Sequence, residues 1–131
     1  MIGILLLSHG NLGDSLIQAA RHVMGKELPH LTHLDVTVVD TPDALLARAN
    51  ALLDQLNQGQ GVLVLSDICG ATPCNVATRL VVTGKVECLA GANLPMLLRA
   101  LTYRHEPLAV VVEKALSGGK EGAVRIQRIE D

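Results

Sequence analysis

Short runs of apolar residues alternate along the chain with longer stretches in which apolar positions recur every three or four residues. The runs are typical of strands buried on both faces of a sheet, and the longer stretches are typical of amphipathic helices. We therefore predict strands over Ile2–Leu7, Leu31–Val39, Gly61–Leu65 and Val86–Ala90. We predict helices over a stretch that ends at Met24, over 42–56 and 73–82, over a stretch that ends at Tyr103, and over 107–116.

The order of these elements predicts a single α/β domain over residues 1–131. Strands that alternate with helices favour an open sheet of four parallel strands with helices on both faces, and we expect the common strand order 2-1-3-4. After the last helix, Ser117-Gly118-Gly119 is expected to interrupt the chain, with Gly118-Gly119 as a candidate hinge. A short terminal strand, Ala123–Ile129, is predicted to follow.

Composition narrows the classes of function. The hydrophobic fraction of 49% is almost entirely aliphatic, and the formal net charge is -2. Lys and Arg form no cluster that could follow a phosphate backbone, and the sequence lacks a group of aromatic residues on which bases could stack. We therefore do not expect the protein to bind nucleic acid. The start of the chain lacks the basic region of a signal peptide, and no apolar run is long enough for membrane insertion, so we expect a cytoplasmic protein. Cys69, Cys74 and Cys88 lack CxxC spacing, and we interpret them as buried free thiols.

Polar side chains follow the predicted strands at one edge of the sheet. His9 follows the first strand, Asp67 follows the third and Asn93 follows the fourth. In an open parallel sheet, ligands bind beyond the carboxyl ends of the strands, at the point where the strand order reverses. The order 2-1-3-4 makes the first and third strands neighbours at that point. We therefore expect His9 and Asp67 to lie together, with Asn93 on the same rim.

This pair predicts phosphoryl chemistry. An aspartate that accepts a bond from one ring N–H of His9 fixes the tautomer, so the opposite ring nitrogen faces outwards as a nucleophile. The charge of Asp67 also stabilises the cationic ring that forms during transfer. Backbone N–H groups of Gly70, Ala71 and Thr72, with the Thr72 hydroxyl and the following helix N-terminus, are suited to bind phosphoryl oxygens. Because the chain has no P-loop and no dinucleotide fingerprint, we expect no cofactor and a phosphoryl group that another protein delivers.

Each feature also has a structural interpretation. A single histidine after a strand is commonly a satisfied polar residue, and the stretch 70–73 has the form of a loop and a helix cap. His30 and His33 are expected to be solvent-exposed around a turn rather than metal ligands. The predicted contact between His9 and Asp67 favours a catalytic interpretation of His9 over a structural one.

Three motifs in register resemble one family. They are Ile4-Leu5-Leu6-Leu7-Ser8-His9-Gly10, then Asp67 with Gly70-Ala71-Thr72-Pro73-Cys74-Asn75, then Ala90-Gly91-Ala92-Asn93-Leu94-Pro95-Met96-Leu97. With the tail that runs from Ala115 to Gly122, they resemble the mannose-family enzyme IIA component of the bacterial phosphoenolpyruvate-dependent sugar phosphotransferase system. The resemblance spans nearly the whole chain. It departs at Ile68, Cys69 and Ala71, where the family commonly has an aromatic residue or leucine and a second glycine.

The resemblance implies that His9 receives a phosphoryl group from phospho-HPr and passes it to a separate IIB component, while Asp67 orients His9. It also implies a homodimer in which the terminal strand, Ala123–Ile129, crosses to the other subunit and pairs antiparallel. The region of Gly118-Gly119 would be the crossover.

Two alternatives stay open. In one, phosphorylation of His9 only switches binding to a partner within an incomplete phosphotransferase system, since a carrier and a signal need the same site. In the other, the chain is a small tetrapyrrole metal chelatase, a class that can begin with an apolar strand ending in Ser/Gly-His-Gly. A chelatase needs a second metal-handling histidine on the same rim, and none follows the third or fourth strand.

Overall fold

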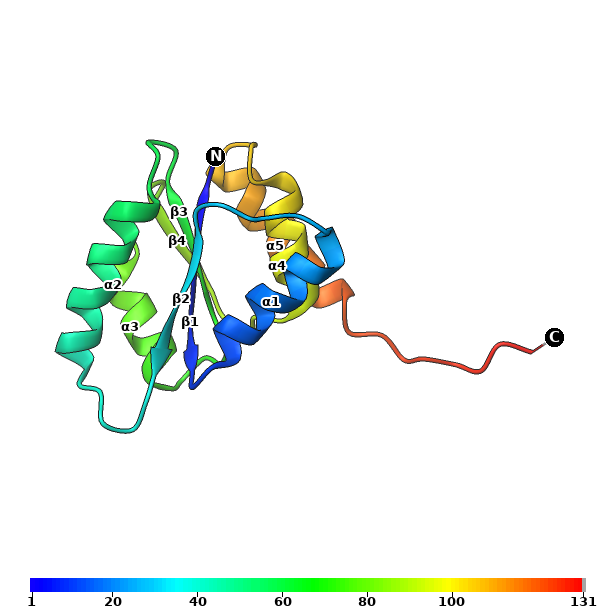
Figure 1. Ribbon diagram of the computed structural model, residues 1–131, viewed down its shortest axis with the longest axis horizontal. Helices are drawn as coiled ribbons and strands as arrows, with labels where there is room; N and C mark the ends of the chain where they lie inside the picture. The colour runs from blue at the N-terminus through cyan, green and yellow to red at the C-terminus, as the bar shows by residue number, and fades with distance from the viewer. Residues whose placement is uncertain (131) are drawn as a thin grey trace.

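Four parallel strands form the centre of the computed structural model, which describes residues 1–130 (Figure 1). They are β1 (Gly3–His9), β2 (Leu31–Val36), β3 (Val62–Ser66) and β4 (Val86–Leu89), and their order in the sheet is β2-β1-β3-β4. The predicted fold class, parallel pairing and strand order are confirmed. Because β1 lies between β2 and β3, the sheet reverses its order where β1 and β3 end side by side.

Within residues 1–130, five helices connect and cover the strands: α1 (Leu12–Met24), α2 (Pro42–Leu56), α3 (Thr72–Leu80), α4 (Leu94–Tyr103) and α5 (Leu108–Glu121). Helices α1, α4 and α5 cover one face of the sheet, and α2 and α3 cover the other (Figure 1). Strand β1 contributes to both layers, since Ile4 and Leu6 face the first and Leu5 and Leu7 face the second. A strand covered on both faces needs a continuous apolar run, which explains the pattern at the start of the chain.

Strand β2 ends at Val36, before the predicted end at Val39, because residues 37–40 form a tight turn. The carboxylate of Asp40 accepts the backbone N–H of Thr37 at 2.8 Å and its hydroxyl at 2.9 Å. Both hydrogen bonds lower the pKa of Asp40, and the one from the Thr37 backbone N–H contributes more than the one from the hydroxyl. The turn leaves Val38 and Val39 exposed beyond the end of the sheet.

Helix α5 continues to Glu121, past the predicted end at Leu116. The prediction that Ser117-Gly118-Gly119 interrupts the chain is therefore wrong, and Gly118-Gly119 is not a hinge. Both glycines are buried against α4. A Cβ atom at Gly118 would lie 2.7 Å from Cβ of Arg99, and one at Gly119 would lie 2.8 Å from Cε of Met96. The glycines are present because two helices pack closely there, although glycine costs a helix about 1 kcal/mol relative to alanine.

Residues 123–130 leave α5 as an extended segment that projects from the domain (Figure 1). Its apolar side chains are exposed: Val124 by 72%, Ile126 by 92% and Ile129 by 90%. Among the described residues this segment pairs with no other strand. Its antiparallel pairing with a second subunit stays a prediction.

Candidate functional site

His9 and Asp67 meet at the carboxyl ends of β1 and β3. Nδ1 of His9 lies 2.8 Å from Oδ2 of Asp67, and the same oxygen accepts the backbone N–H of His9 at 3.0 Å. The other carboxylate oxygen, Oδ1, accepts the backbone N–H of Ile68 at 2.9 Å. These bonds fix the Asp67 side chain, which is only 11% exposed, whereas the His9 side chain is 52% exposed. One edge of the imidazole is therefore held by the protein and the other is open to solvent.

The Asp67 carboxyl is ionised at neutral pH. Partial burial raises its pKa, but the hydrogen bonds from the His9 backbone, the His9 ring and the Ile68 backbone outweigh burial. The net effect holds the pKa of Asp67 below its ordinary value of 3.8. An ionised carboxylate accepts hydrogen bonds only, so the ring proton of neutral His9 is assigned to Nδ1 and the lone pair to Nε2. Nε2 is the ring nitrogen available as a nucleophile.

The loop after Asp67 presents a helix N-terminus to the same place. Gly70 adopts a φ of +90°, and α3 begins at Thr72. The N-cap residue, Ala71, provides no side-chain hydrogen bond to the first turn of α3, so N–H groups at this end are free of a capping acceptor. Such an end carries a partial positive charge and suits an anion.

A hollow of about 520 Å³ lies between His9 and this helix end. It is lined by His9, Gly10, Val36, Thr37, Val38 and Thr72. The structure therefore brings His9 and Thr72 to one hollow, as predicted, whereas Gly70 and Ala71 belong to the same loop but do not line the hollow. The hollow has room for a small anion between His9 and the start of α3.

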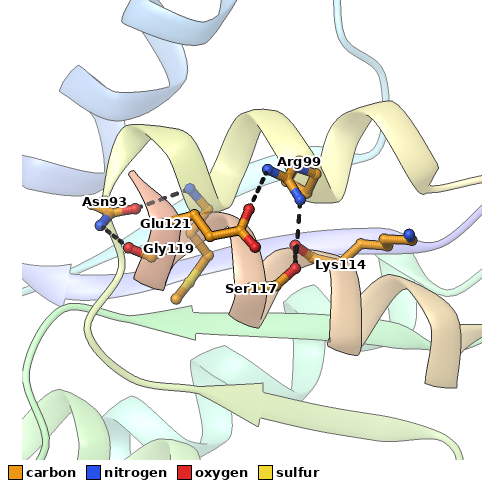
Figure 2. A network of polar contacts seen from close by, with 7 residues as sticks. Asn93, Arg99, Lys114, Ser117, Gly119 and Glu121 are labelled. Carbon is orange, nitrogen blue, oxygen red and sulfur yellow. Dashed lines mark hydrogen bonds and ion pairs between the residues drawn. The ribbon is translucent and has the colours of Figure 1, made fainter. Parts of the chain in front are cut away.

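Asn93 follows β4 along the chain, as predicted, and is the N-cap of α4, but its side chain is not directed to the His9–Asp67 pair (Figure 2). Its Oδ1 accepts the N–H of Met96 at 2.9 Å, and its Nδ2 donates to the carbonyl of Gly119 at 3.1 Å. Asn93 thereby caps α4 and ties it to the end of α5. Within the described residues it contacts neither His9 nor Asp67 through a hydrogen bond, so the structure gives it a packing role.

Arg99 supports the same contact between α4 and α5 (Figure 2). Its guanidinium donates to the hydroxyl of Ser117 at 3.4 Å and to the carboxylate of Glu121 at 3.2 Å. Together with Asn93, Arg99 fixes the end of α5 from which the extended segment leaves.

His33 forms a second histidine–aspartate pair, which differs from the first in one decisive respect. Nδ1 of His33 lies 2.8 Å from Oδ1 of Asp35, and its Nε2 lies 3.6 Å from Oδ1 of Asp14. His30 and His33 are both half-buried, so the expectation that they are solvent-exposed is wrong for each. A carboxylate lies near each ring nitrogen of His33, whose side chain is 32% exposed, whereas His9 is more exposed and pairs with one carboxylate, that of Asp67.

Two features near the site were not predicted. The sequence predicts a strand through Val39, but Thr37 and Val38 lie in a turn that lines the hollow; a Thr and an Asp three residues apart are a recognisable turn signal. Cys69 is exposed, so the interpretation of all three cysteines as buried is wrong. Its loop projects beyond the sheet edge, where the described elements do not cover it.

In the part of the chain that the structure describes, the helices are too short or too polar to cross a membrane. Across residues 1–130, no three His, Cys, Asp or Glu side chains converge in the way that metal ligands do.

Comparison with known proteins points to one family. Residues 3–115 match the family described as the fructose IIA component of the phosphotransferase system. Over 124 residues, the chain is 32% identical to the mannose-specific EIIAB component of Escherichia coli K12, an alignment that covers 92% of this chain and 38% of that protein. It is 28% identical over 105 residues to the fructose-specific EIIA component of Bacillus subtilis, covering 79% of this chain and 71% of that protein.

The fold has solved counterparts. The mannose/sorbose-specific IIA subunit from Enterococcus faecalis superposes with a TM-score of 0.87 at 25% identity, covering 98% of this chain and 97% of that one. The EIIA component from Streptococcus agalactiae superposes with a TM-score of 0.84 at 25% identity, covering 95% and 97%.

The fold and the sequence comparisons together show that this protein is of the EIIA type found in sugar phosphotransferase systems. Within that class, the chain belongs to the mannose and fructose IIA family. It spans 38% of the length of the Escherichia coli relative that it matches.

Proposed function

We propose that this protein accepts a phosphoryl group from phospho-HPr on Nε2 of His9 and passes it to a IIB component. The observation that carries the proposal is the 2.8 Å contact between Nδ1 of His9 and the Asp67 carboxylate. That contact supports a proton on Nδ1 and an Nε2 that acts as the nucleophile. Membership of a phosphotransferase IIA family supports a carrier role in sugar uptake.

In the proposed step, the Nε2 lone pair of His9 attacks phosphorus in the donor's phosphohistidine. The new N–P bond forms as the donor's N–P bond breaks, and the electron pair of the broken bond stays on the donor's ring nitrogen. His9 becomes cationic as the bond forms, and the charge of Asp67 stabilises that state. In this step the N-terminus of α3 and the hydroxyl of Thr72, which lines the hollow with His9, would bind the phosphoryl oxygens. Transfer to the acceptor reverses these roles.

The test is transfer in a purified system. With phosphoenolpyruvate, enzyme I and HPr, the protein is expected to take up an acid-labile phosphoryl group, while His9→Ala takes up none. His33→Ala is the matched control, because His33 also pairs with an aspartate but has a second carboxylate near its other ring nitrogen and does not line the hollow, and this variant is expected to behave as wild type. Labelled His9→Ala, or an unlabelled wild type, contradicts the proposal.

A chase with a IIB component separates the carrier from the regulatory alternative. A carrier loses its label to IIB, whereas a protein that is phosphorylated only as a signal keeps it. The chelatase alternative has no support in family membership, because the chain belongs to a phosphotransferase family.

We also propose a homodimer in which residues 123–129 of each subunit pair antiparallel with β4 of the other. Strand β4 is an edge strand: on its outer side Val86 forms an antiparallel bridge with Val82, and the rest of that edge has no partner strand within the described chain. Beside it lies a hollow of about 820 Å³ whose lining includes Glu87, Val112 and Glu113. The extended segment carries Arg125 and Arg128 between its apolar residues. Opposite charges and matching apolar side chains support this pairing.

A further inference from the structure

A second, smaller hollow of about 80 Å³ also borders Thr72. It lies between the start of α2 and the first turns of α3, and its lining is Pro42, Thr72, Asn75, Val76 and Arg79. Thr72 lines the hollow at His9 as well. The two hollows therefore share one residue, and the smaller one brings a cation, Arg79, to the same part of the molecule.

The Arg79 side chain extends along α3 towards Thr72. The two residues are seven positions apart in the helix, which is about two turns, so they lie on the same face. Side chains of a helix lean towards its N-terminus, so a long one covers the turn before its own residue. The shared lining of the smaller hollow agrees with that direction.

A weak ion pair holds Arg79 in this position. Its Nη1 lies 3.4 Å from Oδ1 of Asp43 in the first turn of α2, and this is its one ion pair among residues 1–130. The side chain of Asp43 is 92% exposed and that of Arg79 is 52% exposed. Exposed pairs of this kind contribute little to stability, so the guanidinium can leave Asp43 for a stronger anion.

The hollow at His9 needs a cation once His9 is phosphorylated. A phosphoryl group brings a charge of about −1.5 to −2, and the ionised carboxylate of Asp67 already lies 2.8 Å from the ring. Within residues 1–130, the lining of this hollow contains no lysine or arginine. The N-terminus of α3 supplies a partial positive charge of about half a unit, which leaves most of the negative charge unbalanced.

We propose that Arg79 is a further catalytic residue of phosphoryl transfer, and that its guanidinium moves from Asp43 to the phosphoryl oxygens beside Thr72. This role rests on the proposed function, because it needs a phosphoryl group on His9. The N–P bonds form and break on His9 and on the other protein's histidine or acceptor group. Arg79 gives up no proton, since its guanidinium stays charged, and its charge stabilises the phosphoryl oxygens during transfer.

Two residues provide matched controls. Arg48 pairs with Asp40 at 3.5 Å and its side chain is 55% exposed, so its ion pair is equivalent to that of Arg79, but Arg48 lines neither hollow. Asp43→Asn removes the partner of Arg79 and keeps the guanidinium. If Arg79 acted only by tying α3 to α2, the loss of Asp43 would have the same effect as the loss of Arg79.

The experiment measures phosphoryl uptake from phospho-HPr by rapid quench. We expect Arg79→Gln to slow uptake by roughly 10- to 1000-fold, as the loss of one oxyanion-binding donor does. Arg79→Lys keeps the charge but not the forked pair of donors, so it should recover part of the rate. Arg48→Gln and Asp43→Asn are expected to take up the group at the wild-type rate.

The charge state of the phosphoryl group gives a second measurement, which a purely structural role would not change. A nearby guanidinium favours the dianion, so the pKa of the phosphoryl group on His9 should be higher in Arg79→Gln than in wild type. Titration of the phosphorylated proteins by ³¹P NMR gives this pKa, and Arg48→Gln should leave it unchanged.

The contrary results separate this role from the proposed function. A wild-type uptake rate for Arg79→Gln, or an unchanged pKa of its phosphoryl group, overturns the role of Arg79 and leaves the proposed function intact. An equal loss of rate in Asp43→Asn shows that the ion pair is structural and also overturns it. If the wild type takes up no phosphoryl group, the proposed function fails and the role of Arg79 fails with it.

Discussion

Asp67 holds His9 at two atoms: one carboxylate oxygen accepts the His9 backbone N–H at 3.0 Å and faces Nδ1 of its ring at 2.8 Å, although 58 positions separate the two residues. The parallel register of β1 and β3, in which Leu7 pairs with Ser66, brings them together. One side chain therefore fixes both the position and the tautomer of the histidine.

Asp67→Asn tests the electrostatic part of this relationship. The amide retains a hydrogen-bond acceptor but has no charge to stabilise a cationic ring, so we expect transfer to slow by roughly 10- to 1000-fold with the fold intact. Rapid-quench measurement of phosphoryl uptake from phospho-HPr gives the rate. Asp35→Asn is the control, since Asp35 pairs with His33 at the same 2.8 Å away from the hollow. A wild-type rate for Asp67→Asn removes Asp67 from the mechanism.

The pH dependence of stability follows from the lowered pKa of Asp67. A carboxyl whose pKa is lower in the folded than in the unfolded state stabilises the fold fully above its unfolded value. That contribution is lost as the pH falls through the folded pKa. We therefore expect the free energy of unfolding of wild type and Asp67→Asn to differ most above the ordinary value of 3.8 and to converge below it. Urea titrations across the acid range measure this; a difference that grows on acidification would rule it out.

Gly118→Ala is expected to destabilise the protein although alanine favours helices. Helix propensity alone would stabilise α5 by about 1 kcal/mol. The new Cβ would meet Cβ of Arg99 at 2.7 Å and the carbonyl oxygen of Pro95 at 3.1 Å, and neither atom lies at the far end of a flexible side chain. Overpacking of this kind costs about 1–3 kcal/mol, so we expect a net loss. Chemical denaturation checks it, with exposed Lys120→Ala on the same helix as control; a stabilised Gly118→Ala would show that α4 and α5 are not tightly packed.

Removal of residues 123–131 is expected to convert the proposed dimer to a monomer, because the apolar residues Val124, Ile126 and Ile129 would otherwise cover β4 of the second subunit. Sedimentation at matched concentrations measures the mass. Charge reversal at Arg125 and Arg128 serves as a milder variant and should weaken the dimer without shortening the chain. A truncated protein that still sediments as a dimer places the interface elsewhere.

The parts of the fold that follow from the alternation of strand and helix patterns along the sequence were predictable. The fully apolar run at β1 requires helices on both sides, and that requirement with the strand order is enough to bring His9 beside Asp67. The position of Asn93 was predictable for the same reason, because it follows a strand at the same edge.

The parts that depend on close packing were not predictable. Gly118 looks like a helix breaker in sequence, and only the approach of Arg99 shows why a glycine is needed inside α5. The engagement of Asn93 with Gly119 likewise depends on where α5 ends. Arg104 is a third case: this buried guanidinium donates to backbone carbonyls of Ile2, Pro29 and His30, and nothing in its local sequence indicates that.

The central claim is tested most directly by locating the phosphoryl group on the protein. The phosphorylated chain, with labelled imidazole nitrogens, is examined by NMR after uptake from phospho-HPr. Because Nδ1 of His9 is held by Asp67 at 2.8 Å, we predict a single phosphorylated residue, His9, with the phosphoryl group on Nε2 and the proton retained on Nδ1. Phosphorylation of Nδ1, or of any residue other than His9, would contradict the account.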